Sequence, residues 1–172
     1  RSVPSFDELM ADCEHSAVHL EMRDVYTSED EAQDFAAWQA GHRHDPTDRA
    51  SWWTPWLDLI AATTARGVTV RRARVVSQPV TTYIAYEHAC THQNIAAGEH
   101  VRWLPRSRAS DLLLPGNDLW VMDDRLVRFN LFTGNGEFLH HVDLHDAALA
   151  KQCVTAFEAV WERAVPHEDF EV

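Results

Sequence analysis

The 172-residue chain has room for one domain of ordinary size, and its 45% hydrophobic and 24% charged residues are typical of a globular protein. Its 27 acidic residues outnumber its 15 basic ones, and the formal net charge of −12 opposes direct binding to nucleic acid. The three cysteines form no CxxC pair, which predicts neither a disulfide framework nor a zinc site. No apolar run of membrane-spanning length and no secretory signal occurs, so we expect a cytoplasmic, single-domain protein.

The first fifty residues predict a helix, a strand and a second helix. A short helix covers residues 6–13, and the alternating apolar and polar side chains of residues 18–22 indicate a half-buried strand. The next helix begins at Ser28 with an acidic first turn, which suits the helix dipole, and it ends at Gly41. The polar segment 42–50 is predicted to be a loop.

The middle of the chain alternates between helices and strands. An amphipathic helix is predicted over residues 51–66, followed by an arginine-rich strand over residues 68–76. Pro79 is placed in the first turn of a further helix that runs to about Ala97. A short strand over residues 101–104 completes this part.

The last third predicts a β-meander and a closing helix. Strands are expected over residues 119–122, 126–132 and 138–142, with a tight Asp123-Asp124 turn after the first. The final helix covers residues 146–164. The side chains expected to pack it on the sheet are Val154, Phe157, Val160 and Trp161. The sequence therefore predicts an α/β fold, a mixed sheet flanked by helices.

Four stretches of sequence carry a family resemblance. They are residues 16–24 (SAVHLEMRD), 72–88 (beginning RARVVSQPV and ending YIAYEH), 102–106 (RWLPR) and 115–124 (PGNDLWVMDD). In order and spacing they resemble an actinobacterial, Streptomyces-type family of small single-domain proteins of unknown function. Its members are often encoded beside helix-turn-helix regulators of the Xre type. The resemblance covers nearly the whole chain and implies a regulator as protein partner, but no activity.

A second resemblance is architectural. A helix leading into RGVTV (residues 66–70), a strand that ends in two acids, a hairpin and a terminal helix look like one half of a phospholipase-D-like domain. The resemblance places this core in residues 51–172, with residues 1–50 as an N-terminal helix-strand-helix portion of the same domain.

The catalytic motif of such domains is missing. Active members carry HxKxxxxD, in which His attacks phosphorus, Lys holds phosphate oxygens and Asp supports the site. With the aspartate at Asp124, Asn117 and Leu119 stand at the His and Lys positions, and neither can do that chemistry. The only lysine is Lys151, two residues after Leu149, so no HxK occurs. The resemblance then implies a catalytically silent version.

Arginines on the predicted strands, together with nearby acids and aromatic residues, are the first candidate for a ligand-binding or partner-binding site. The guanidinium group binds carboxylates and phosphates through two hydrogen bonds, but the same arginines could instead form structural ion pairs. The candidates are Arg72, Arg74, Tyr83, Tyr86, Glu87, Arg102, Arg106, Asn117, Asp118, Trp120 and Asp123. We expect Arg74, Tyr86 and Asn117 to face one crevice beyond the strand ends.

A histidine pair is the second candidate site. His88 and His92 are four residues apart on one predicted helix and therefore share a face, as two metal ligands would. Glu87 precedes His88, so the HExxH motif is not formed. No GxSxG, GxGxxG or Walker motif occurs either, and we assign no catalytic residue and no cofactor.

These observations favour a non-catalytic regulatory or interaction protein. It would act as the partner of a helix-turn-helix regulator or sense a small ligand. The alternative is a small enzyme, a hydrolase or a metal-dependent one, that uses the Arg/Asp/Tyr pocket or the histidine pair. Direct binding to nucleic acid is opposed by the charge, and no membrane partner is expected. The oligomeric state stays open.

Overall fold

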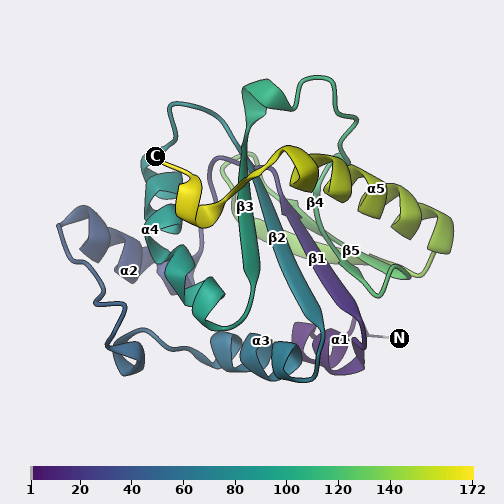
Figure 1. Cartoon of the computed structure of the whole chain (residues 1–172), viewed down its shortest axis with the longest axis horizontal. Coiled ribbons are helices and arrows are strands. Elements are labelled where there is room, and N and C mark those ends of the chain that lie inside the picture. The colour runs from purple at the N-terminus through teal and green to yellow at the C-terminus, as the bar shows by residue number, and fades with distance from the viewer. Residues whose placement is uncertain (1) are drawn as a thin grey trace.

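In a computed structural model that describes residues 2–172, these residues fold into one seven-stranded mixed sheet with helices on both faces (Figure 1). The helices are α1 Phe6–Asp12, α2 Glu29–Gln39, α3 Pro55–Ala65, α4 Thr82–Ala96 and α5 Ala147–Arg163. The strands are β1 Ser16–Glu21, β2 Thr69–Val76, β3 His100–Pro105, β4 Asp118–Met122, β5 Leu126–Phe132, β6 Phe138–Leu144 and β7 Val165–Pro166. The predicted mixed α/β fold is confirmed.

The sheet combines a parallel centre with antiparallel sides. Its strand order is β6-β5-β4-β1-β2-β3-β7. Strands β1, β2 and β3 run parallel, whereas β4 is antiparallel to β1 and begins the meander through β5 and β6. Both residues of the predicted tight turn, Asp123 and Asp124, have positive φ angles of 51° and 55°. Aspartate tolerates this left-handed conformation better than most residues do, which explains its use in the turn.

Helix α5 covers one face of the sheet through the predicted apolar stripe. Phe157 and Val160 are fully buried against strand residues such as Leu20 and Val75, and Val154 and Trp161 pack at the edge of this core. Because alternate residues of a strand point to opposite faces, the other face carries a separate apolar core under α1 and α3. The expected packing of the last helix on the sheet is confirmed.

Two helix starts differ from the prediction. Helix α3 begins at Pro55 rather than at residue 51, because the Thr54 hydroxyl accepts a hydrogen bond from the Leu57 amide at 3.3 Å. Helix α4 begins after Thr81, whose hydroxyl caps it in the same way, and this leaves Pro79 outside the helix. A Thr side chain at the N-cap satisfies a free amide, which a proline further upstream does not do.

Helix α2 is the least integrated helix. It lies outside α4 at the rim of the molecule (Figure 1), and none of its residues is buried. Phe35 and Trp38 attach it to α4 through Tyr86, with ring centroids 5.1 Å and 5.9 Å apart. The space between α2, α3 and α4 contains the site described below. No helix in the described part of the chain is long and apolar enough to cross a membrane.

Candidate functional site

Buried charges occupy the centre of the sheet on the face that α3 and α4 cover. Arg72 and Arg74 point from β2 to this face. Arg72 donates from Nε to Glu99 Oε1 at 2.5 Å and from Nη1 to Glu21 Oε1 at 2.8 Å. Arg74 donates from Nη1 to Glu87 Oε2 at 2.8 Å. We call these five side chains the charged network.

The two arginines of the charged network favour the ionised form of Glu21. Burial alone would raise the pKa of Glu21, but Arg74 and Arg72 lower it to about 2. The side chain of Glu99 is fully buried and that of Arg74 is only 4% exposed. Both arginines therefore form ion pairs, which is the structural alternative to ligand binding that the sequence left open. Three glutamates against two arginines leave one excess negative charge.

A cavity of about 750 Å³ lies against this network. Arg72, Arg74 and Glu87 are at its inner end, and Asp30, Glu31 and Asp34 of α2 form one side. Its aromatic residues are Trp52, Trp53, Trp56 and Tyr86. The volume lies within the range of small-molecule sites, and the four aromatic side chains share the lining with many polar and charged groups. We call it the tryptophan cavity.

Some guanidinium donors at the inner end are unused. The hydrogen bonds of Arg72 engage Nε and Nη1, and that of Arg74 engages Nη1, so neither Nη2 bonds to any residue in the range 2–172. Arg74 Nε is buried without a hydrogen-bond partner, and its nearest carboxylate oxygen, Glu21 Oε1, is 3.5 Å away. An unpaired buried donor costs free energy, so a ligand oxygen that accepted from these arginines would be stabilised.

Two glutamates at the cavity share a tyrosine. The Tyr83 hydroxyl lies 2.7 Å from Glu87 Oε1 and 2.9 Å from Glu31 Oε2. Glu31 is partly buried, and the loss of hydration together with the neighbouring Glu87 raises its pKa to about 8, whereas Arg74 overcomes burial and lowers the pKa of Glu87. At neutral pH the pair therefore holds one proton, which resides on Glu31.

Asn117 and Asp118 lie at a second, smaller cavity of about 360 Å³. There the Met22 amide donates to Asp118 Oδ1 at 2.9 Å, and the Tyr26 hydroxyl donates to Oδ2. Burial and Glu21 raise the pKa of Asp118 to about 7. Arg106 lines the same cavity and donates from Nε to the Ser77 hydroxyl at 3.1 Å.

The structure thus distributes the predicted site over two cavities. Arg74 and Tyr86 line the tryptophan cavity, whereas Asn117 lines the smaller one, and the single crevice expected from the sequence is wrong. Tyr83, which hydrogen-bonds to Glu87 at the first cavity, and Tyr26, which hydrogen-bonds to Asp118 at the second, have ring centroids 6.1 Å apart. The sequence did not predict that these two tyrosines meet, because Tyr26 precedes α2 whereas Tyr83 lies on α4, far along the chain.

The remaining candidates have structural contacts. Arg102 Nη1 donates to the Trp161 carbonyl on the α5 face at 3.1 Å. Trp120 stacks on His19 with ring centroids 4.0 Å apart. Asp123 accepts hydrogen bonds from three successive backbone amides, of residues 14 to 16, and so fixes the start of β1.

The two histidines of the proposed pair contact different partners. His88 Nε2 lies 2.8 Å from the Phe170 carbonyl oxygen, and His92 packs edge-on against Trp52. Burial lowers the pKa of both. Among residues 2–172 no group of three or more His, Cys, Asp or Glu side chains is arranged to hold a metal ion.

Sequence reasoning missed most of the tryptophan cavity. Trp53 and Trp56 fall within the amphipathic helix that the sequence predicts over residues 51–66, and Glu31 falls within the acidic first turn of the predicted helix that begins at Ser28. A signal was available, since three tryptophans within five residues beside a polar loop exceed what a short helix can bury. No local sequence pattern indicated that Glu21 and Glu99 form ion pairs with the arginines.

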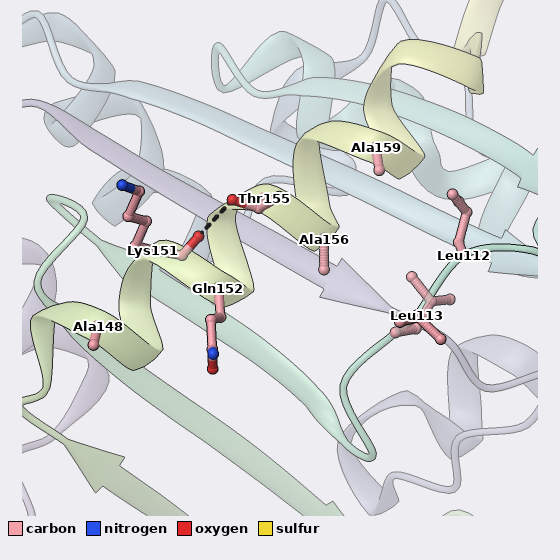
Figure 2. A pocket seen from close by; sticks show the side chains of 9 residues that line it. Leu112, Leu113, Ala148, Lys151, Gln152, Thr155, Ala156 and Ala159 are labelled. Carbon is pink, nitrogen blue, oxygen red and sulfur yellow. Dashed lines mark hydrogen bonds between the residues drawn. The ribbon is translucent and has the colours of Figure 1, made fainter.

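A third hollow, of about 460 Å³, follows the outer side of α5. Figure 2 shows its α5 residues on one side and Leu112 and Leu113 on the other. Leu113 is 96% exposed. The only side-chain hydrogen bond drawn there joins the Thr155 hydroxyl to the Lys151 carbonyl within the helix (Figure 2). This groove offers apolar surface but no buried polar group that could orient a ligand.

Comparisons with known proteins bear on the fold. Nuc, a phospholipase D family member from Salmonella typhimurium, aligns with a TM-score of 0.52 and 13% identity over 93% of this chain and 86% of its own. NucT from Helicobacter pylori aligns with a TM-score of 0.52 and 11% identity over 93% and 87%. The predicted phospholipase-D-like topology is confirmed. No curated protein matches the chain. A family model for a domain of unknown function matches residues 4–172.

Proposed function

The chain belongs to this family, described as Domain of unknown function (DUF6879), and we propose that it is a non-catalytic sensor that binds a small ligand in the tryptophan cavity. One observation carries the proposal. The cavity brings aromatic walls together with the Nη2 groups of Arg72 and Arg74, which make no hydrogen bond within residues 2–172. Such a combination of apolar surface and a few convergent polar groups orients a bound molecule.

The absence of catalysis is proposed from the residues at the motif positions. Leu119 is fully buried in the core under α5, on the opposite face from Asp118, and it cannot reach a ligand. We expect the purified protein not to hydrolyse bis(p-nitrophenyl) phosphate, with or without added divalent cations. Asn117→Ala and Asp124→Ala variants serve as controls. Turnover by the parent that disappears in either variant would contradict a silent site.

The cavity itself can be tested with a pair of tryptophan substitutions on α4. Gln93 lines the cavity, and its side chain makes no hydrogen bond in the described structure, so Gln93→Trp should fill the cavity without disturbing the fold. Ala96 is exposed on the same helix outside the lining, and Ala96→Trp is the matched control. In a thermal-shift screen of metabolites, we expect compounds that stabilise the parent and the control to lose at least about tenfold in affinity for Gln93→Trp, about 1.4 kcal/mol. Equal binding by all three proteins would place the site elsewhere.

We propose that the ligand-bound protein acts by binding a protein partner. The actinobacterial resemblance implies that this partner is a helix-turn-helix regulator of the Xre type. The net charge of −12 supports binding to a basic protein rather than to DNA. We expect the protein alone not to retard duplex DNA at physiological salt, but to supershift its regulator on an operator. Tight sequence-specific DNA binding by the isolated chain would overturn this assignment.

A further inference from the structure

We propose that the ligand of the tryptophan cavity is an organic cation, a molecule with a protonated amine and a neutral oxygen acceptor such as a hydroxyl or carbonyl group. The inference rests on the proposed function, because it names the ligand class of the same cavity. It departs from the carboxylate or phosphate ligand that an arginine cluster suggests. Charge, aromatic walls, unused donors and proton linkage each support it.

The ionisable groups around the cavity are predominantly acidic. Asp30, Glu31, Asp34 and Glu87 line it, and Glu21 and Glu99 contact the two arginines from behind. Six acids and two arginines carry a net charge of −4 when all are ionised. Asp30 and Asp34 are exposed at the rim, whereas Glu87 is at the inner end. Asp30 and Asp34 attract a cation at the rim, and Glu87 offers it a carboxylate further in, whereas an anion is repelled at the entrance.

The aromatic walls already contact cations within the protein. The guanidinium carbon of Arg72 lies 5.5 Å from the ring centroid of Trp56, and that of Arg49 lies 3.6 Å from the ring centroid of Trp53. The face of an indole ring attracts positive charge, more strongly when water is excluded. Trp52 and Tyr86 complete the walls. An ammonium group held among these rings would gain cation–π attraction in addition to its attraction to the acids.

The inner end of the tryptophan cavity favours an uncharged hydrogen-bond acceptor. Arg74 is 4% exposed, lines the cavity and has a buried Nε without a hydrogen-bond partner. The charged network already has one glutamate in excess, so a carboxylate or phosphate placed there would add repulsion. A hydroxyl or carbonyl oxygen satisfies the Arg72 and Arg74 donors without that cost. The ligand therefore needs both an amine and a neutral oxygen.

The shared proton couples cation binding to pH. Glu31 faces Glu87, Tyr83, Tyr86 and Cys90 of α4 and, further in, Glu21 of β1. An ammonium group beside Glu31 and Glu87 favours the fully ionised pair, so the proton of Glu31 is released to solvent as the cation binds. Cation affinity should therefore rise from about pH 6 to about pH 8, the range in which the free protein still holds the proton that binding must displace.

The test uses two compounds that share a scaffold and carry end groups of opposite charge. Tyramine and 3-(4-hydroxyphenyl)propionate share a ring, a hydroxyl group and a two-carbon arm, but carry an ammonium and a carboxylate group respectively. Binding to the full chain is followed by calorimetry, and tryptophan indole NMR signals locate the site. We expect tyramine to bind at least about tenfold more tightly at about pH 8, and more tightly there than at about pH 6.

Two glutamine variants of helix α2 complete the design. Glu31→Gln mimics the protonated acid and should fold, but its tyramine affinity should be low and independent of pH. Glu29→Gln makes the same change in the same helical turn outside the cavity lining, and it should behave as the parent does.

Three outcomes would overturn the inference. They are equal or tighter binding of the carboxylate, tyramine binding that leaves the indole signals of Trp52, Trp53 and Trp56 unchanged, and no tyramine binding at all. Its failure is distinguishable from failure of the proposed function. If metabolites still bind the parent but not Gln93→Trp, the cavity is a ligand site for another class of molecule.

Discussion

Arg72→Ala is expected to lower the free energy of unfolding by about 3–5 kcal/mol. The substitution removes the guanidinium group that donates to Glu99 at 2.5 Å and to Glu21 at 2.8 Å. The Glu99 side chain has no exposed surface, and Asn94 Nδ2, at 3.1 Å from Oε2, would be its remaining partner. A carboxylate left buried beside one neutral amide must either stay charged at high cost or take up a proton.

Arg71→Ala is the matched control, because Arg71 is the preceding residue on β2 and points to the opposite face. Its partner Glu158 is 45% exposed, and a partly exposed pair contributes only about 0–1 kcal/mol. Urea denaturation of both variants gives the comparison. The double variant Arg72→Met/Glu99→Met should be more stable than Arg72→Ala, because it leaves no unpaired charge at position 99. Equal stability of Arg72→Ala and Arg71→Ala would contradict the importance of the charged network.

Raising the pH from about 5 to about 8 is expected to destabilise the parent protein, with helix α2 affected first. The pKa of Glu31 is raised from an ordinary 4.5 to about 8 by burial and by Glu87. Between these values the folded protein keeps a proton that the unfolded chain has released, so stability falls as pH rises. One such proton changes the free energy of unfolding by at most about 1.4 kcal/mol per pH unit. Above about pH 8 the loss is complete.

The local consequence follows from the position of α2. No residue of this helix is buried, and besides the contacts of Phe35 and Trp38, the carboxyl of Glu31 on Tyr83 is its polar anchor. Ionising Glu31 places two negative charges around one phenol. Because amide exchange is itself faster at higher pH, the quantity to compare is the protection factor of the α2 amides. It should fall between about pH 5 and about pH 8, before that of the sheet amides.

Glu31→Gln separates this effect from other ionisations. Glutamine keeps the hydrogen bond to Tyr83 and cannot ionise, so the variant should lose the downward slope and exceed the parent in stability at about pH 8. Asp118, whose pKa is raised to about 7, contributes a slope of the same sign to both proteins and cancels in the difference. Glu29→Gln should follow the parent. Parallel stability curves for parent and Glu31→Gln would rule out the shared proton.

Local sequence determined the secondary structure and the packing of the last helix. Thr54 and Thr81 cap their helices by hydrogen bonds that reach three residues, and the apolar spacing of α5 fits the sheet face that it covers. The missing HxK, which depends only on neighbours in sequence, was equally visible. Such features form within a few residues, so a linear reading is sufficient for them.

Tertiary structure alone decided which polar groups meet. Arg72 finds its partners in Glu21, 51 residues earlier, and Glu99, 27 residues later, and Glu31 meets Glu87 only because α2 docks on α4. Strand pairing across the sheet and helix docking create these contacts, and periodicity carries no information about either. The sequence therefore determined which side chains were available, whereas the order β4-β1-β2-β3 and the position of α2 decided that they enclose two cavities rather than one.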